Sequence, residues 1–297
     1  MSGLAIRPAV QRDVDPEKVL MALEVQLERS FEHLRGKQRC AVLFSGGVDS
    51  ALAALITSRM CEDTLLITAR CKDSHDEKVA AHAAEAMSLD IAEVLIDSES
   101  LWNVLPSVVH SIHSRKRMDI EISIPFFFAA QEAKARGYHL LVSGQGPDEL
   151  FAGYSRYERL MVTEGTERVE EALWADVSVT DEANIQRDVR VIESQGLEAF
   201  FPFLYHEFVR IALTLPATLN INPNKTPARK LIFRELAMKL GVPKEVAMTP
   251  KRATQFSSGT SKMLTKSLKE HVTTLSNLRK KALQQAITKF LEGMKLE

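Results

Sequence analysis

A short apolar run followed by a glycine turn marks the first candidate site. Residues 40–50 have the sequence Cys-Ala-Val-Leu-Phe-Ser-Gly-Gly-Val-Asp-Ser, and an alanine-rich stretch follows over residues 51–60. This order predicts a strand, a tight turn and a helix N-terminus, an arrangement that binds phosphate through backbone N–H groups. Gly46 and Gly47 can adopt the backbone angles that such a turn needs and let an anion approach closely. The pattern therefore indicates phosphate binding, although a glycine turn without a ligand has the same sequence signature.

The polar side chains of this turn suit a metal-bound nucleotide. Ser45 and Ser50 supply hydroxyl donors, and Asp49 places a carboxylate where it could hold Mg²⁺ beside the phosphates. The lysine of the Walker-type phosphate loop is absent. The pattern Ser-Gly-Gly-x-Asp-Ser instead resembles the pyrophosphate loop (PP-loop) of the N-type ATP pyrophosphatases, which cleave ATP to AMP and pyrophosphate. ATP and Mg²⁺ are therefore the expected cofactors.

A second glycine turn follows another apolar run and carries paired acids. Residues 140–154 have the sequence Leu-Leu-Val-Ser-Gly-Gln-Gly-Pro-Asp-Glu-Leu-Phe-Ala-Gly-Tyr. Taken alone this is weak evidence, because acids in a first helical turn often just complement the helix dipole. Two parallel strands that end at the same edge of a sheet would, however, place Asp49 and Asp148 on opposite sides of one phosphate site. The two turns together predict a Mg²⁺ ion held by these two carboxylates.

The elements that position these turns alternate between strand and helix patterns, which predicts an α/β fold with a doubly wound parallel sheet. Leucines and a phenylalanine at helical spacing predict a helix over 15–34, with Asp15 and Pro16 as its start signal. The further strands are expected over 64–69, 91–96 and 138–143, and the further helices over 75–87, 100–111 and 124–136.

The second half of the chain is predicted to be mostly helical. Residues 155–297 contain almost no strand-like runs but several amphipathic, charged ones, such as 159–174 and 230–240. The tail over 267–296 is also expected to be helical, and its charges either form a solvated face or bind RNA or another partner. We therefore divide the chain into a helical N-terminal segment, a PP-loop ATP-binding α/β part, and a helical part that completes the active site: residues 1–36, 37–155 and 156–297.

The order of motifs resembles the synthetase domain of asparagine synthetases and their relatives, including β-lactam synthetases. That family carries the first turn, then Ser-Gly-Glu-Gly-x-Asp-Glu-x-Phe-x-Gly-Tyr, a Leu-Glu-x-Arg-x-Pro-Phe-Leu-Asp segment, a lysine before a Leu-Arg-Glu helix, and a Pro-Lys loop. This chain has Leu-Glu-Ala-Phe-Phe-Pro-Phe-Leu-Tyr over 197–205, Lys-Leu-Ile-Phe-Arg-Glu over 230–235 and Pro-Lys-Arg-Ala-Thr-Gln-Phe over 250–256. The match runs in order from about residue 17 to residue 265. It implies a fold like that of the adenine nucleotide alpha hydrolases.

The resemblance assigns roles to individual residues. Lys230 would stabilise charge at the α-phosphate, and Lys251 would contact pyrophosphate, although either lysine could be a solvated surface charge. The expected nucleotide-binding residues surround adenine and the phosphates: Leu43, Ser45, Gly46, Gly47, Asp49, Ser50, Ala69, Ser143 and Gly144. Leu43 and Ala69 could equally belong to the core of the sheet.

Three positions depart from the family pattern. Gln145 stands where the family has a glutamate that is thought to help deprotonate the attacking nitrogen. An amide cannot accept that proton, so general-base catalysis would need another group or water. Phe200 replaces the usual arginine and Tyr205 the usual aspartate, which removes a charge pair near the site. Gln145 is therefore a candidate catalytic residue whose role differs from that in the family.

Glutamine-using members begin with a catalytic cysteine directly after Met in a glutaminase domain of their own. Here residue 2 is Ser, and Asp49 comes too early for such a domain to precede it. We therefore expect nitrogen to arrive as free ammonia, from a separate glutaminase subunit, or as an amine on the substrate. A homodimer is also left open.

Composition limits the other classes of function. The net charge of −1 argues against a protein whose main partner is nucleic acid, although RNA is not excluded. The three cysteines lack metal-site or redox spacing and suit a reducing compartment. No signal-peptide core or membrane-length apolar run is present, so a cytoplasmic protein with no membrane partner is expected.

The leading hypothesis is an ATP-dependent ligase that activates a small-molecule carboxylate as an acyl-adenylate and transfers it to nitrogen. Formation of asparagine from aspartate is the leading named reaction. An RNA-modifying enzyme that adenylates a base oxygen is the alternative within the same fold. A nucleotide-binding scaffold that has lost catalysis is the alternative of another class.

Overall fold

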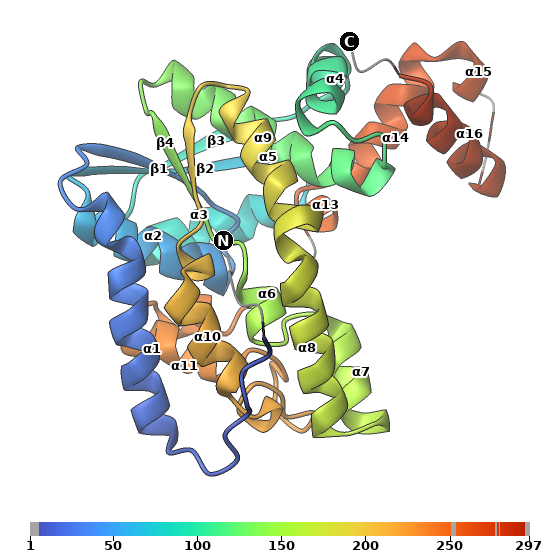
Figure 1. Ribbon diagram of the computed structural model, residues 1–297. Helices are drawn as coiled ribbons and strands as arrows, with labels where there is room; N and C mark the ends of the chain where they lie inside the picture. Colours follow the sequence, from blue (N-terminus) through green and yellow to red (C-terminus); the bar gives the residue numbers. More distant parts are fainter. Residues whose placement is uncertain (1–5, 251–253, 277, 279, 295–297) are drawn as a thin grey trace.

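The computed structural model describes residues 6–250, 254–276, 278 and 280–294, and in these residues five parallel strands form a sheet in the order β3-β2-β1-β4-β5 (Figure 1). The strands are β1 (Arg39–Leu43), β2 (Asp63–Arg70), β3 (Ile91–Leu95), β4 (Leu140–Ser143) and β5 (Glu198–Phe200). The strand order reverses between β1 and β4, which is where open parallel sheets bind ligands at the carboxyl ends of their strands. The predicted doubly wound α/β fold is confirmed.

Successive side chains of a strand point to opposite faces of the sheet, and this explains why helices cover both faces. On β1, Cys40 and Val42 enter one hydrophobic core while Ala41 enters the other. On β4, Leu140 and Val142 belong to the first core and Leu141 to the second. Because both faces of these strands are apolar, both must be buried, as is typical of parallel sheets.

Two groups of longer helices build the two cores. The first core contains residues of α1 (Pro16–Phe31), α2 (Val48–Met60), α3 (His75–Met87), α10 (His206–Thr214) and α11 (Leu231–Lys239). The second contains residues of α4 (Ser98–Ile112), α5 (Arg117–Ala135), α9 (Gln186–Glu193), α14 (Thr260–His271) and α16 (Lys280–Glu292). The other helical segments are η1 (Glu32–Leu34), α6 (Pro147–Leu150), α7 (Ser155–Thr163), α8 (Thr166–Thr180), η2 (Asp181–Ile185), η3 (Pro202–Leu204), η4 (Ala217–Leu219), α12 (Lys244–Ala247), α13 (Thr254–Ser257) and α15 (Thr273–Ser276).

The N-terminal helix α1 begins where the sequence predicts. The Asp15 side chain accepts a hydrogen bond from the Glu17 N–H at 3.0 Å, and Pro16 occupies the first helical position. Its buried residues pack against α10 and α11, which come from the second half of the chain (Figure 1). The N-terminal segment and the helical part of our division therefore share the first core.

Helix α5 starts at Arg117 and not near Ile124 as the sequence suggests, and Pro125 lies inside it. Proline has no N–H, so it leaves the Glu121 carbonyl without its usual helical donor. The Thr260 hydroxyl, at the start of α14, donates a hydrogen bond to that carbonyl at 2.9 Å. A contact from a distant segment thus replaces the missing bond, and the sequence around Pro125 contains no sign of it.

One further prediction for the second half is wrong. The helical run expected over 159–174 is two helices, α7 and α8, because Gly165 between them has a φ of 86°, outside the helical range. The expectation of almost no strands after residue 155 is confirmed, because the described residues there contain one named strand, the short β5, which pairs with β4 and completes the sheet. With only three residues, β5 is too short to produce a strand pattern.

The cysteines form a pair that their spacing does not indicate. Cys40 on β1 and Cys61 just beyond α2 are joined in a disulfide, while Cys71 is buried and unpaired. Burial raises the pKa of the Cys71 thiol to about 12. The disulfide does not support the expectation of a reducing compartment, which rested on the irregular spacing.

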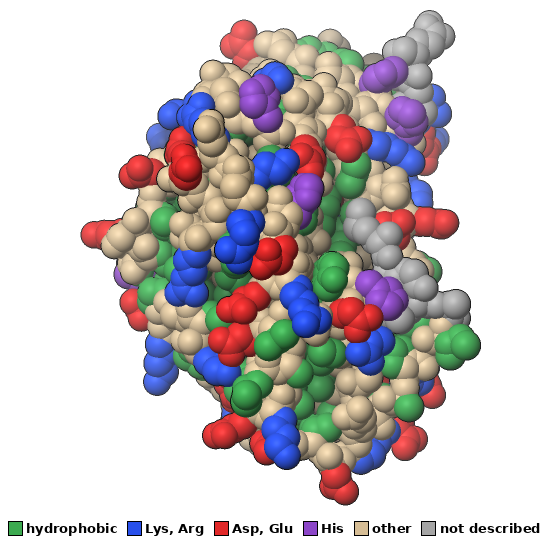
Figure 2. Space-filling model, turned by 60° about the vertical axis from the view of Figure 1, so that its left-hand side comes forward, with side chains coloured by type: hydrophobic (Ala, Val, Ile, Leu, Met, Phe, Trp, Pro, Cys, Tyr) green, Lys and Arg blue, Asp and Glu red, His purple; other side chains and the backbone are tan. Residues whose placement is uncertain are grey.

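Within the described part of the chain, no helix has both the length and the apolar character needed to cross a membrane. Acidic and basic side chains intermingle over the described residues of the face drawn in Figure 2, in keeping with a net charge of −1.

The contact that satisfies Glu121 generates a stability prediction. Replacing the fully buried Thr260 with valine keeps the shape but removes the donor to the Glu121 carbonyl. The free energy of unfolding in urea should fall by about 1–3 kcal/mol, the usual cost of an unsatisfied buried polar group.

The matched control for this change is Thr163→Val. The exposed Thr163 hydroxyl also donates to a helix carbonyl, that of Arg159, but water can replace it there. This control should alter the free energy of unfolding by less than about 0.5 kcal/mol. Equal losses in the two variants would contradict our account of α5.

Candidate nucleotide and metal site

The two glycine turns lie side by side at the carboxyl edge of the sheet. Leu43, the last residue of β1, is in register with Ser143, the last residue of β4. The chain then turns into α2 after β1 and into α6 after β4. The residues that follow the two strands are therefore brought together, as the sequence predicts.

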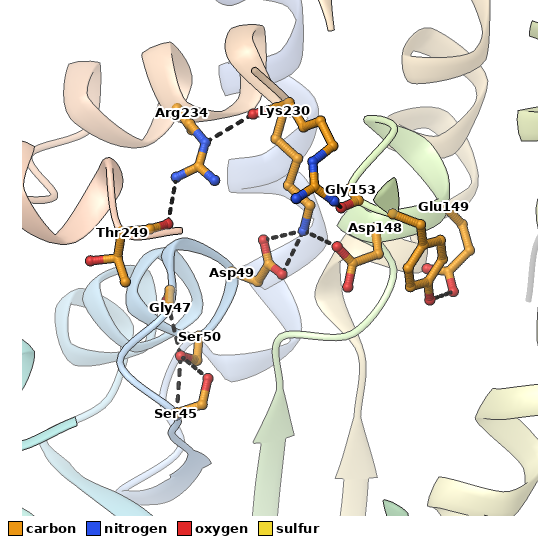
Figure 3. Close-up of polar contacts among 12 residues, drawn as sticks. Ser45, Gly47, Asp49, Ser50, Asp148, Glu149, Gly153, Lys230, Arg234 and Thr249 are labelled. Atoms are coloured by element: carbon orange, nitrogen blue, oxygen red, sulfur yellow. Dashed lines mark hydrogen bonds and ion pairs between the residues drawn. The ribbon is translucent and has the colours of Figure 1, made fainter. Parts of the chain in front are cut away.

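The first turn is held rigid by its own hydroxyl groups (Figure 3). The Ser50 hydroxyl accepts a hydrogen bond from the Ser45 N–H at 3.2 Å and donates one to the Gly47 carbonyl at 3.0 Å. Gly46 has a φ of 75°, and a Cβ there would lie 2.6 Å from the Val79 carbonyl oxygen. Only glycine fits this position. The turn leads into α2, whose first N–H groups have no partner in their own helix and can bind an anion.

One buried lysine joins the acids of the two turns (Figure 3). The Lys230 ammonium lies 2.8 and 2.7 Å from the two carboxylate oxygens of Asp49 and 2.6 Å from Oδ1 of Asp148. The Lys230 side chain is only 1% exposed. It extends from the residue before α11, where the backbone takes the left-handed conformation with a φ of 57°. Three charges from three separate elements thus meet at one point.

Gly153 leaves the room that this contact needs. A Cβ at this position would lie 1.9 Å from Oδ1 of Asp148 and 2.3 Å from Cε of Lys230. The Gly153 carbonyl accepts a hydrogen bond from Nη1 of Arg229 at 2.6 Å, which fixes the backbone next to Lys230. A side chain at residue 153 would therefore displace both partners of the ion pair.

The donor set fits Mg²⁺. Asp49 and Asp148 converge on a single positive charge, and carboxylate oxygens are ligands that Mg²⁺ prefers. The neighbouring Glu149 has a different environment, since its carboxylate accepts a hydrogen bond from the Tyr154 hydroxyl at 2.6 Å. Burial, and next the charge of Asp148, raise the pKa of Glu149 to about 7. Asp49 and Asp148 are therefore better suited than Glu149 to hold a metal.

A pocket beside the turns contains most of the expected nucleoside-binding residues. The residues from the prediction that line it are Leu43, Ser45, Asp49, Ser50, Ala69, Ser143, Gly144 and Gln145. Pro125 and Phe126 of α5 supply an apolar wall. This lining suits a purine ring at one end and phosphates at the other.

A second pocket continues from the first at Ser45 and Asp49 and has a more polar lining. It contains Gly47 and Lys230, together with Arg234 and Thr249. Its position over the start of α2 makes it the expected place for the pyrophosphate end of ATP. The two pockets together therefore bring together the predicted nucleotide-binding residues except Gly46, which packs against Val79.

Sequence reasoning missed Arg234, which is 2% exposed. Its guanidinium donates to the Arg229 and Thr249 carbonyls, both at 3.0 Å, and burial lowers its pKa. A signal was present, because Arg234 lies in the same Lys-Leu-Ile-Phe-Arg-Glu segment as Lys230, in the first turn of α11. Lys251, the other predicted catalytic lysine, lies outside the described residues.

The fold and the pockets define the chain as a PP-loop type α/β protein, and comparison with known proteins gives its family. The chain belongs to the asparagine synthase family, whose model matches residues 22–168 and 161–292. It is 31% identical over 269 residues to a Methanocaldococcus jannaschii protein named as a glutamine-hydrolysing asparagine synthetase, covering 81% of this chain and 49% of that protein. It is also 27% identical over 277 residues to an asparagine synthetase domain-containing protein of Saccharomyces cerevisiae, covering 79% of this chain and 50% of that protein. The chain thus spans about half the length of these curated relatives.

Among solved structures, the chain is similar to NMN synthetase from Francisella tularensis. The TM-score is 0.42 with 13% sequence identity, and the match covers 96% of this chain and 89% of that chain. An ammonia-dependent NAD synthetase from Campylobacter jejuni has a TM-score of 0.40 with 12% identity, over 94% of each chain.

The contact between Lys230 and the two acids generates a prediction about metal binding. A Lys230→Met variant removes the buried ammonium that contacts the carboxylates of both Asp49 and Asp148. The free energy of unfolding should fall by about 3–5 kcal/mol, as when one partner of a buried ion pair is removed. Millimolar Mg²⁺ should restore part of it, because the carboxylates then gain a cation. Thermal melting with and without Mg²⁺, in the absence of nucleotide, measures both effects.

Lys239→Met is the control for this prediction. Lys239 pairs with Glu24 at 2.6 Å, but its side chain is 40% exposed. Its loss should cost less than about 1 kcal/mol and give no response to Mg²⁺. If Mg²⁺ raised the melting temperature of the wild type as much as that of Lys230→Met, the lysine would not compete with a metal for these carboxylates.

Proposed function

We propose that the chain is an ATP-dependent amide-forming ligase that adenylates a small-molecule carboxylate, with aspartate as the leading candidate. The products of ATP would be AMP and pyrophosphate. The nitrogen would come from ammonia or from a separate glutaminase subunit. The observation that carries this proposal is the meeting of Asp49, Asp148 and Lys230 beside the Ser-Gly-Gly turn.

The position of the charged groups supports attack at the α-phosphorus. The first N–H groups of α2 and the hydroxyl groups of Ser45 and Ser50 would bind the β- and γ-phosphates. A carboxylate oxygen of the substrate would attack the α-phosphorus, and the bond to the bridging oxygen would break with its electron pair leaving on pyrophosphate. Lys230 would stabilise the negative charge that develops on the α-phosphate. Asp49 and Asp148 would hold Mg²⁺, which would neutralise phosphate charge when bound.

The second half of the reaction would transfer the acyl group to nitrogen. An uncharged amine would attack the acyl carbon, and the C–O bond to AMP would break. The amine must also lose a proton, and Gln145 cannot take it because an amide is not a base at neutral pH. The proton would therefore pass to water or to the departing phosphate.

Exchange of radiolabelled pyrophosphate into ATP tests the first half-reaction. We expect exchange that depends on Mg²⁺ and on a carboxylic acid, with aspartate tested first in a panel of acids. Direct product analysis should give AMP and pyrophosphate. ADP and phosphate as the main products would contradict the PP-loop assignment.

Asp49→Ala should abolish exchange while the protein stays folded, since Asp49 follows the strand and lies outside both hydrophobic cores. Asp90→Ala is a matched control, because Asp90 is exposed and far from the turns in the fold. Its exchange rate should equal that of the wild type. ATP binding without exchange for any acid would favour a nucleotide-binding scaffold, and tRNA-dependent ATP cleavage would favour the RNA-modifying alternative.

A further inference from the structure

The position that departs from the family pattern contacts a buried carboxylate. Gln145 lines the nucleoside pocket next to Ser143 and Gly144. Its side-chain amide nitrogen, Nε2, donates a hydrogen bond to Oδ2 of Asp188 at 3.1 Å. Asp188 belongs to α9, and it is not among the site residues predicted from the sequence.

Asp188 is completely buried and its two oxygens are both engaged. Its Oδ1 accepts a hydrogen bond from Nε of Arg187 at 2.8 Å and forms an ion pair with Nη2 of the same side chain at 2.7 Å. Arg187 is itself 5% exposed, and its Nη1 lies 3.6 Å from Oδ1 of Asp119. Burial raises the pKa of the Asp188 carboxyl, and the charge of Arg187 opposes that rise. Since all three groups that contact its oxygens are N–H donors, the ionised carboxylate is the form that fits.

This contact decides which end of the Gln145 amide is available to a substrate. An ionised carboxylate only accepts hydrogen bonds, so it can pair with the NH₂ group of Gln145 but not with its carbonyl oxygen. The carbonyl oxygen, Oε1, accepts no hydrogen bond from any residue that the structure describes. With Nε2 turned to Asp188, Oε1 is left for the pocket.

We propose that Asp188 is a positioning residue that holds the Gln145 carbonyl oxygen toward the reacting centre, where it accepts a hydrogen bond from the N–H of an incoming ammonia or primary amine. This inference rests on the proposed function, because it assigns the nucleophile of the second half-reaction. The hydrogen bond orients the nitrogen lone pair toward the acyl carbon. Gln145 takes no proton, so the nucleophile must arrive uncharged and its proton leaves to water or to the AMP phosphate.

The arrangement separates the two half-reactions. The carboxylate of Asp188 contacts Gln145 and Arg187, whereas Lys230 at the phosphate end pairs with Asp49 and Asp148. Changing Asp188 should therefore affect acyl transfer and spare adenylation. A residue that only maintained the fold would affect both.

The first test is Asp188→Asn, with aspartate, ammonia and ATP as substrates. An asparagine at 188 can donate to Oε1 of Gln145 and so stabilise the flipped amide, with NH₂ toward the pocket. Amide formation should fall by about 10–100-fold, in the range seen when the partner that orients an active-site ligand is removed, while pyrophosphate exchange should stay within about twofold. Equal losses in both rates would overturn the proposal in favour of a structural role.

Exchanging the two groups gives a sharper outcome. Gln145→Glu alone places a second carboxylate within hydrogen-bond distance of Asp188, and like charges at that distance oppose each other. Amide formation should fall in this variant. The double variant with Gln145→Glu and Asp188→Asn restores a pair of one amide and one carboxylate, so amide formation should recover by at least tenfold over either single variant. Additive losses in the double variant would contradict direct coupling.

Glu170→Gln is the matched control for loss of a buried carboxylate. Glu170 is 3% exposed and pairs with Arg12 at 2.7 Å in another part of the fold. Its ratio of amide formation to pyrophosphate exchange should equal that of the wild type. A shift in this ratio as large as that of Asp188→Asn would overturn the assignment.

A spectroscopic arm does not depend on the substrate. In protein labelled with ¹⁵N-glutamine, the side-chain NH₂ signals that vanish in Gln145→Asn belong to Gln145. These signals should shift in Asp188→Asn and stay in place in Glu170→Gln. Unchanged signals in Asp188→Asn would overturn the amide orientation itself. Absence of pyrophosphate exchange in the wild type, with the expected NMR shift, would instead refute the proposed function alone.

Discussion

The architecture of the candidate site depends on the contact between one buried ammonium and two carboxylates. Asp49 and Asp148 follow neighbouring strands and would repel each other at this separation without a cation. Lys230, which is 181 residues from Asp49 in the sequence, supplies that cation from the start of α11. Helix α11 can dock there because Gly153 leaves space for the lysine side chain. The folded chain thus has a compensated site before any nucleotide binds, and the α/β part and the helical part of our division are joined at its centre.

Much of this site could be predicted from the sequence, because it is built from local patterns. A strand, a glycine turn and a helix start are recognised within about ten residues, and parallel strands always bring their carboxyl ends to one edge. This rule alone places the turn at Gly46 beside the turn at Gly144, as the register of β1 and β4 shows. The resemblance placed Lys230 near the α-phosphate, but its contact with the two acids was not predicted, and no local pattern around Lys230 indicates it.

What could not be predicted depends on contacts between distant segments. Helix α5 continues through Pro125 because Thr260, more than a hundred residues away, satisfies the Glu121 carbonyl. The strand β5 is defined by its pairing with β4, since its three residues have no pattern of their own. Asp188 lies in an amphipathic helix where an acid is usually a surface residue, and it is buried because α9 packs against α4 and α5. Such features need the tertiary structure.

Under the proposed function, the distribution of charge around the two pockets would separate the phosphate end from the acyl end, where the acyl group would be transferred to nitrogen. The phosphate end is lined by Lys230, Arg234 and Asp49, and any change of charge there would disturb phosphate binding directly. The acyl end is different, because the side chain that lines the pocket there, Gln145, is neutral. The nearest carboxylate is that of Asp188, which accepts a hydrogen bond from Gln145. Compared with a glutamate at position 145, this pair keeps the negative charge of Asp188 away from the phosphates. It also leaves the reacting centre without a base. Under the proposed function, this arrangement would favour nucleophiles that need orientation more than deprotonation, which is the property of an uncharged amine.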